Sequence, residues 1–358
     1  MKTTEVLHNL GQSIWLDNIT RELLDTGRLK RYIDDLSVTG LTSNPTIFDH
    51  AITHSSSYDP EIRRLVGTSR STEELFFDLA LGDLTRAADL FLPVHERTAG
   101  MDGWVSLEVS PLLAYDAKAT VEQAKVLHRK ANRRNLLIKI PGTREGAPAI
   151  EEAVFSSVPV NVTLLFTRDH YMAAADAYMR GLERRVEAGL SPDVRSVASF
   201  FISRWDKATM DRVPARDRDR LGIAIGQQAY AAYRGVLDSD RWQRLANCGA
   251  RAQRLLFAST GTKDPKASDV LYVGALAAPN TVNTMPEETL LAFGEHGHVD
   301  GVLPHDGADS EQVLAEFGRV GIDVAELGIQ LQAEGAKSFD DSWQDLMKAI
   351  EAKNRALK

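Results

Sequence analysis

The chain has 358 residues, 43% apolar and 26% charged, a composition typical of globular proteins with a sizeable core. The net charge of −8 argues against a broad basic surface for nucleic acid, and no segment has the uninterrupted apolar length of a membrane span. The N-terminus lacks the apolar stretch of a signal peptide, and a single cysteine, Cys248, excludes an internal disulfide. We therefore expect a cytoplasmic protein in which Cys248 is a small buried residue.

Short apolar runs alternate with longer amphipathic segments along the chain, and polar or Gly/Pro loops separate them. Residues 71–91, 116–134, 167–189 and 218–237 have apolar positions at helical spacing. Strands that alternate with helices predict a parallel sheet. The eight predicted strands are Ser13–Asp17, Val38–Ser43, Trp104–Val109, Leu136–Ile140, Val160–Phe166, Ser196–Ile202, Arg254–Ser259 and Thr281–Met285.

Eight strand–helix units in a chain of this size predict an α/β fold of the (β/α)8 TIM barrel type. An open Rossmann-type sheet is the main alternative, but no predicted strand is followed by a glycine-rich dinucleotide fingerprint. We expect a single barrel domain over residues 1–358. Its part from about Pro286 should be mainly helical and should cap or decorate the barrel.

Polar residues lie at the C-terminal ends of successive predicted strands, where the active sites of such barrels form. Taken alone, some have a structural interpretation: Asp17 as the cap of a helix beginning near Ile19, Asn44 as a turn residue, and Thr163 as a β-branched strand residue. Their shared position favours one site, because independent structural polar residues should scatter over both rims. In chain order the set is Asp17, Asn44, Glu108, Lys139, Asn161, Thr163, Ser199, Arg204, Ser259 and Lys263.

Lys139 lies in the middle of an apolar run, in the segment LLIKIPGTREG (136–146). A buried lysine is rarely tolerated unless it is paired or used. Burial disfavours the ammonium form, and a free amine can attack a ketone to give a Schiff base, whose iminium accepts electrons when a neighbouring C–C bond breaks. Asp17 and Glu108 are carboxylates that can carry the protons of such a reaction. The alternative is a structural lysine, with its stem buried or with Glu108 as its ion-pair partner.

The remaining polar residues of the set suit a phosphorylated sugar. Asn44, Asn161 and Ser199 can hold hydroxyl groups, while Arg204 and the loop with Ser259 and Lys263 offer positive charge and donors for a phosphate.

A second group of chemically active side chains lies in HGHVDGVLPHD (296–306), which contains three histidines and two aspartates. Histidine and aspartate are common zinc ligands. The glycine and proline content is typical of a surface loop, and no predicted helix or strand fixes the directions of these side chains. We therefore predict no metal site.

Six segments resemble signature sequences of the transaldolase family, and specifically of its longer bacterial subgroup. They are LTSNPT (41–46), VSLEVSP (105–111), LLIKIPGTREG, VNVTLLF (160–166), SFFISR (199–204) and LLFASTGTKDP (255–265). The resemblance, from about Ser13 to Pro286, implies a class I aldolase-type barrel in the non-oxidative pentose phosphate pathway. Such an enzyme transfers a dihydroxyacetone unit from sedoheptulose 7-phosphate to glyceraldehyde 3-phosphate. We accordingly expect sugar-phosphate partners, no cofactor, no nucleic-acid or membrane partner, and a monomer or homodimer.

The resemblance also assigns roles by motif. Lys139 matches the Schiff-base lysine, Asp17 the acid/base that handles the donor hydroxyl, and Glu108 with Thr163 the pair that positions a catalytic water. The substrate-contacting positions are Asn44, Asn161, Ser199, Phe201, Ser259 and the phosphate-binding Arg204.

The chain departs from the family pattern after the seventh predicted strand. Many relatives have Ser-x-Arg there, whereas this chain has Ser259-Thr260-Gly261. We predict Lys263 as the replacement for the missing phosphate-binding cation.

Two other functions stay open at this point. A simple aldolase on the same barrel would cleave fructose 6-phosphate and release free dihydroxyacetone, although by the resemblance Glu108 and the chain length favour transfer. A non-catalytic sugar-phosphate sensor would need phosphate and hydroxyl contacts but not Lys139, Asp17 and Glu108 together.

Overall fold

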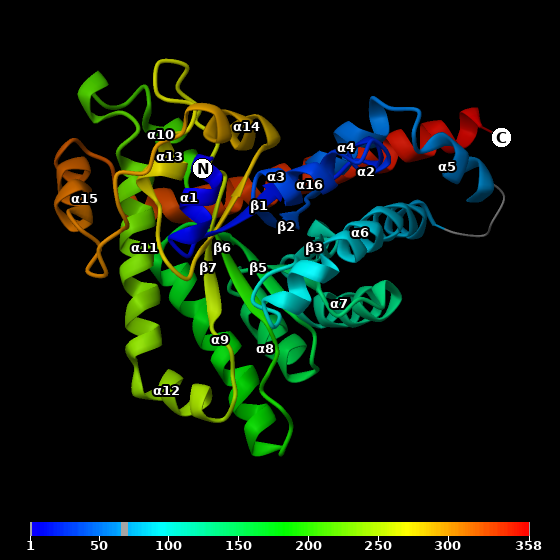
Figure 1. The fold of residues 1–358 in the computed structure, drawn as a ribbon, viewed down its shortest axis with the longest axis horizontal. Helices are drawn as coiled ribbons and strands as arrows, with labels where there is room; N and C mark the ends of the chain where they lie inside the picture. The colour runs from blue at the N-terminus through cyan, green and yellow to red at the C-terminus, as the bar shows by residue number, and fades with distance from the viewer. Residues whose placement is uncertain (1, 66–70, 358) are drawn as a thin grey trace.

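The computed structural model of the chain describes residues 2–65 and 71–357, and its eight strands close into one parallel barrel (Figure 1). The predicted (β/α)8 barrel is thus confirmed. Each predicted strand boundary lies within one residue of the observed one. The strands are β1 Ser13–Asp17, β2 Val38–Thr42, β3 Trp104–Glu108, β4 Leu136–Pro141, β5 Val160–Leu165, β6 Ser196–Phe201, β7 Gln253–Ala258 and β8 Val282–Met285.

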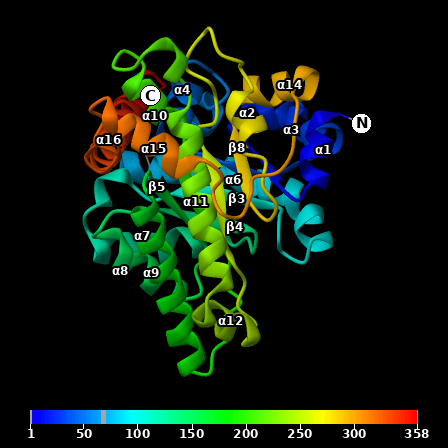
Figure 2. The ribbon, with the colours of Figure 1, turned by 90° about the vertical axis from the view of Figure 1, so that its left-hand side faces the viewer.

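Helices connect the strands and surround the barrel (Figures 1 and 2). None of the helices in the described ranges is long and apolar enough to cross a membrane. They are α1 Thr3–Asn9, α2 Arg21–Asp25, α3 Arg28–Asp35, α4 Pro45–Thr53, α5 Asp59–Leu65, α6 Thr72–Arg97, α7 Ala117–Ala131, α8 Gly146–Phe155, α9 Arg168–Glu187, α10 Ser203–Thr209, α11 Leu221–Asp238, α12 Asp240–Asn247, α13 Leu271–Ala275, α14 Glu287–His296, α15 Ser310–Arg319 and α16 Val324–Ala356.

The long helix α16 lies across the C-terminal ends of several strands. In Figure 1 it is the red helix that runs from the side of α10 and α15 to the C-terminus beside α5. The Gln332 amide donates to the carbonyls of Gly142 and Leu164, at 3.1 and 2.9 Å, which ties α16 to the ends of β4 and β5. Further along, the Trp343 ring packs edge-on against Phe76 of α6, with ring centroids 5.0 Å apart. The helix therefore forms part of the wall above the barrel interior.

Two structural interpretations from the sequence are wrong. Asp17 does not cap a helix near Ile19, because α2 begins at Arg21 and the Thr20 hydroxyl caps it. Cys248 is exposed rather than buried. It is the residue that follows α12, and Gly249, at φ +97°, comes directly after it where the helix ends.

Polar side chains fill the N-terminal end of the barrel interior. The Trp15 ring is buried against Gly40, where a Cβ would lie 2.6 Å from the indole. The Trp15 Nε1 and the Ser13 hydroxyl donate to the Asp102 carboxylate, at 3.1 and 2.5 Å, and Arg254 pairs with the same carboxylate at 3.3 Å. Polar residues thus gather at both ends of the barrel. The clustering of polar residues alone therefore does not identify the predicted site. Its position at the C-terminal ends of the strands distinguishes it from the polar cluster at the other end.

Candidate active site

A pocket of about 240 Å³ lies at the C-terminal ends of the strands. It brings together most of the residues predicted from the sequence. Nine of them line it: Asp17, Asn44, Lys139, Thr163, Ser199, Phe201, Arg204, Ser259 and Lys263. The other two, Glu108 and Asn161, lie behind the wall and contact Lys139 and Ser199 respectively.

Lys139 is buried, with 5% of its surface exposed, on the interior face of β4. The strand register pairs it with Glu108 of β3 and with Asn161 of β5, so the three side chains point to the same face. Its Nζ donates to the Ser43 carbonyl at 2.9 Å and lies 3.1 Å from Glu108 Oε2. The ion pair considered from the sequence is therefore present, in a position that also exposes the amine to the pocket.

Glu108 is an incompletely satisfied buried carboxylate, with 5% of its surface exposed. Neither oxygen makes a hydrogen bond of good geometry within the described ranges, and the ion-pair partner of the carboxylate is Lys139, 3.1 Å from Oε2. Burial raises the pKa of Glu108, against the opposing effect of the Lys139 charge. A carboxyl group in this environment can bind and release a proton more readily near neutral pH.

Asp17 approaches the same lysine from the end of β1. It accepts a hydrogen bond from the Thr42 hydroxyl at 2.7 Å. Burial raises the pKa of Asp17, and the charges of Lys139 and Lys263 act in the opposite direction. Asp17 and Glu108 thus form two carboxyl groups with raised pKa values around one amine.

The β5 and β6 residues form a polar wall beside Lys139. The Ser199 hydroxyl donates to Asn161 Oδ1 at 2.7 Å, and Asn161 Nδ2 donates to the Ser106 hydroxyl at 3.1 Å. Thr163 is fully buried, yet its hydroxyl has no partner within the described ranges. The next residue, Leu164, has φ +61°, a strained value for a bulky side chain, in the irregular part of the β5–β6 pairing. An unsatisfied hydroxyl beside backbone strain is a feature that ordinary packing does not require.

Asn44 serves both the local fold and the pocket. Its Oδ1 accepts from the backbone N–H of Ile47 at 3.0 Å and caps α4, while Pro45 occupies the first helical position. The same side chain lines the pocket. The turn interpretation and the site interpretation are therefore compatible.

The wall of the pocket carries further positive charge. Arg204 of α10 lies with its guanidinium carbon 5.6 Å from the centroid of the Phe201 ring, and burial lowers its pKa. Lys263 lies in the loop after β7, and within residues 2–65 and 71–357 no carboxylate forms an ion pair with either cation. Ser259, at φ +56°, starts that loop, and its hydroxyl contacts the Ser203 hydroxyl at 2.9 Å. Two cations in the wall of one pocket, neither paired with a carboxylate of the described residues, suit an anionic group such as a phosphate.

The sequence interpretation missed several lining residues. Phe339 of α16 lies with its ring centroid 5.8 Å from Lys139 Nζ, and no local pattern marks it among the apolar positions of that helix. Thr284 of β8 contacts the Thr42 hydroxyl at 2.7 Å. Its position two residues after the interior-facing Val282 is a signal that could have found it.

The histidines of segment 296–306 contact separate partners. His296 lies 2.9 Å from Asp269, His298 lies 2.8 Å from Asp300, and the His305 ring packs against Tyr230. Within the described ranges, no three histidine, cysteine, aspartate or glutamate residues converge as metal ligands would.

Comparison with known proteins places this geometry in one family. Residues 14–350 match the model of the transaldolase/fructose-6-phosphate aldolase family. The chain is 43% identical to a transaldolase of Parafrankia sp. (strain EAN1pec), over 95% of each chain. It is 42% identical to the transaldolase of Saccharopolyspora erythraea, over 97% of this chain and 96% of the relative. It is also 40% identical to that of Mycolicibacterium smegmatis, over the same shares of the two chains.

Proposed function

The chain belongs to the transaldolase/fructose-6-phosphate aldolase family of enzymes, and on this basis we propose that it transfers a dihydroxyacetone unit from sedoheptulose 7-phosphate to glyceraldehyde 3-phosphate. The proposed reaction proceeds through a Schiff base on Lys139, in the cytoplasm, as a step of the non-oxidative pentose phosphate pathway. The observation that carries the proposal is the buried Lys139 amine between two carboxyl groups with raised pKa values.

The Lys139 amine attacks the ketone carbon of the donor, and loss of water from the carbinolamine gives an iminium. Removal of the proton from the C4 hydroxyl breaks the C3–C4 bond, and the electron pair moves into the iminium to form an enamine. Erythrose 4-phosphate leaves. The enamine then attacks the aldehyde carbon of glyceraldehyde 3-phosphate, and hydrolysis of the new iminium releases fructose 6-phosphate and free Lys139.

Asp17 is the proposed acid/base for the donor hydroxyl, and Glu108 with Thr163 is proposed to position the water of imine formation and hydrolysis. Their geometry supports these roles. Glu108 lies 3.1 Å from the amine, Asp17 lines the same pocket, and Thr163 presents a hydroxyl with no protein partner among the described residues.

Arg204 and Lys263 are proposed to bind the phosphate groups, with Ser259 as a neutral donor beside them. The proposal for Lys263 rests on its position in the pocket wall, next to Gly261. By the family resemblance many relatives have arginine at the position of Gly261, and Lys263 is proposed to supply the charge from two residues further along the chain.

Borohydride trapping tests the covalent intermediate. Incubation with fructose 6-phosphate and reduction should attach a three-carbon unit to the peptide that contains Lys139. Lys139→Met should abolish trapping and lower turnover by at least about 10⁴-fold, because the covalent route is lost. Lys337→Met is the matched control, since Lys337 is a surface residue of α16 that pairs with Asp341. Trapping at another lysine would contradict the proposal.

A second assay separates transfer from simple cleavage. With fructose 6-phosphate alone, a transferase should accumulate the enamine intermediate and release little free dihydroxyacetone, whereas an aldolase should release it continuously. Continuous release at a rate unaffected by erythrose 4-phosphate would identify the aldolase alternative. The sensor alternative is set aside because the family is one of enzymes.

A further inference from the structure

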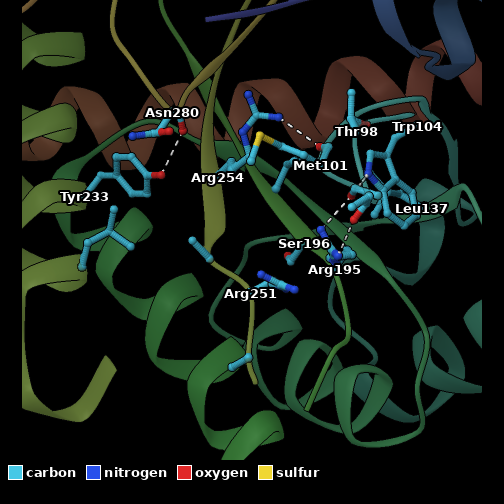
Figure 3. Close-up of a pocket in the computed structure, with 16 residues that line it drawn as sticks. Thr98, Met101, Trp104, Leu137, Arg195, Ser196, Tyr233, Arg251, Arg254 and Asn280 are labelled. Atoms are coloured by element: carbon cyan, nitrogen blue, oxygen red, sulfur yellow. Dashed lines mark hydrogen bonds between the residues drawn. The ribbon is translucent and has the colours of Figure 1, made fainter. Parts of the chain in front are cut away.

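A second pocket, of about 350 Å³, lies at the opposite, N-terminal end of the barrel (Figure 3). Leu137 near the start of β4 and Val197 near the start of β6 form its floor, and the chain segments that lead into β3, β7 and β8 form its rim. It shares no lining residue with the pocket around Lys139. Its volume is within the range of sites that hold small molecules.

The lining of this pocket has an unbalanced charge. Arg195, Arg251 and Arg254 line it, and no aspartate or glutamate does. Arg195 pairs with Asp193 at 2.7 Å and Arg254 with Asp102 at 3.3 Å, so both charges are compensated from outside the pocket wall. Among residues 2–65 and 71–357, no carboxylate pairs with the Arg251 guanidinium. Arg251 is an exposed side chain, so the pocket offers a ligand one solvent-accessible cation without an ion-pair partner among the described residues.

Arg254 also has unused hydrogen-bonding capacity. Its terminal nitrogens donate to Asp102, to the Ser13 hydroxyl and to backbone carbonyls. The residue is only 8% exposed, yet its Nε has no partner in the described part of the chain. A buried donor without a partner is rare in native structures, but this nitrogen is shielded from solvent, so Arg254 does not present it to the open pocket.

Apolar side chains and three neutral polar residues, Thr98, Ser196 and Asn280, form the rest of the lining. The Trp104 Nε1 donates to the Gly100 carbonyl at 3.0 Å, which fixes the indole, and the Tyr233 hydroxyl donates to the Asn280 carbonyl at 2.9 Å (Figure 3). These rings thus have satisfied polar atoms, but Trp104 and Tyr233 are at most 4% exposed, so the accessible apolar surface of the pocket comes mainly from Met101 and the half-buried Leu237. A rigid apolar wall with one free guanidinium combines two features that small-molecule sites share.

We propose that this pocket binds a small organic anion. Its carboxylate or phosphate group pairs with Arg251, and its apolar body packs against Met101 and Leu237. An inorganic ion would make no contact with the apolar side chains, and a neutral hydrocarbon would make none with the Arg251 charge, so the proposed ligand has both an anionic group and an apolar body.

Titration with defined probes tests the proposal on the whole chain. The probes are 4-fluorobenzoate and phenyl phosphate as organic anions, 4-fluorobenzyl alcohol as a neutral match, and inorganic phosphate. We expect either organic anion to bind at least about tenfold more tightly than the neutral and inorganic probes, the loss of one charge-assisted contact corresponding to about this factor. The chemical shifts of the methyl groups of Val197, Leu137 and Leu237 should change during the titration and reach a plateau when the pocket is saturated. The tighter of the two anions identifies the headgroup.

Variants locate the contact. Arg251→Met should weaken 4-fluorobenzoate binding about tenfold, and Arg251→Lys should retain most of the affinity. Arg216→Met makes the same charge change at a side chain that is 85% exposed and outside the pocket, and should leave the affinity unchanged. The proposal fails if no probe binds at millimolar concentration, or if Arg251→Met binds as the wild type does. It also fails if inorganic phosphate binds as tightly as phenyl phosphate, or if only the Ala258 methyl, in the catalytic pocket, responds.

Discussion

Two buried ion pairs lie inside the barrel, one near each end, and their surroundings differ. At the N-terminal end, Asp102 pairs with Arg254 at 3.3 Å and also accepts hydrogen bonds from Ser13 and Trp15. At the C-terminal end, Glu108 pairs with Lys139 at 3.1 Å but makes no well-formed hydrogen bond within the described ranges. Both carboxylates are almost fully buried, at 3% and 5% exposure.

The two carboxylates differ in the hydrogen bonds that they make. This difference distinguishes a structural ion pair from the pair that is proposed to be reactive. A buried charge with its hydrogen bonds made is held in one ionised state, and removal of its partner is costly. A buried charge with bonds unmade can change its protonation with little rearrangement, as acid/base catalysis requires. Burial raises the pKa of Glu108, whereas the network around Asp102 joins three other side chains across the barrel. Two equally buried carboxylates therefore lie in surroundings that favour different roles, a structural one for Asp102 and the proposed acid/base role for Glu108.

The largest expected effect is on stability at the N-terminal end. Asp102→Asn should lower the free energy of unfolding by about 3–5 kcal/mol, because it leaves the Arg254 charge uncompensated and disturbs two hydrogen bonds. Urea unfolding measures the change. Asp193→Asn is the control: it breaks a half-exposed pair with Arg195 and should cost less than about 1 kcal/mol. Equal losses in the two variants would remove the contrast between the barrel ends.

The next effect is on turnover at the C-terminal end. Glu108→Gln should lower kcat about 10²-fold, which corresponds to about 2.7 kcal/mol, because the amide cannot exchange the proton of the catalytic water. Its stability loss should be smaller than that of Asp102→Asn, since Glu108 has no formed hydrogen bond to lose and the Asp17 charge still acts on Lys139. Steady-state kinetics and urea unfolding of the same preparation provide both values. A large stability loss with unchanged kcat would assign Glu108 a structural role.

The raised pKa of Glu108 gives a pH-dependent signature of stability. Between the ordinary carboxyl pKa, about 4.3, and the raised value, the folded chain retains a proton that the unfolded chain has released. The contribution of Glu108 to stability therefore decreases as pH rises through this window, by up to about 1.4 kcal/mol per pH unit. Relative to wild type, Glu108→Gln should become more stable as pH rises from 4.3 and then level off. Parallel stability curves would show that the pKa of Glu108 is not raised.

The barrel and most residues of the pocket could be predicted from the sequence, because both depend on patterns among neighbouring residues. Each strand is a short apolar run that ends at glycine, proline or a polar residue, so its C-terminal end can be read from the chain. In a parallel barrel all these ends lie on one rim, which is why residues as distant as Asp17 and Lys263 line one pocket. The predicted roles of these residues remain proposals.

The parts that were not predicted depend on contacts between distant segments. Phe339 reaches Lys139 only because α16 crosses the rim, and nothing near position 339 encodes that path. The Asp102 network joins the loop before β3 to β1 and β7, at sequence separations of 87 to 152 residues. Arg254 was open to prediction by the reasoning that selected Lys139, because it too is a charged residue bordering an apolar run.

The smallest expected effect concerns a single hydroxyl group. The sign of the change in the free energy of unfolding distinguishes a buried hydroxyl without a hydrogen-bond partner from one that has a partner. Thr163→Val removes a buried hydroxyl that has no protein partner among the described residues, so it should raise the free energy of unfolding by about 1 kcal/mol and lower kcat about tenfold. Thr260→Val is the matched control, because the Thr260 hydroxyl is equally buried but donates to Asn283 at 2.9 Å. There the same substitution should cost about 1 kcal/mol. If both variants lose stability, the Thr163 hydroxyl is satisfied in solution, and its proposed role in positioning water would lose the structural feature that supports it.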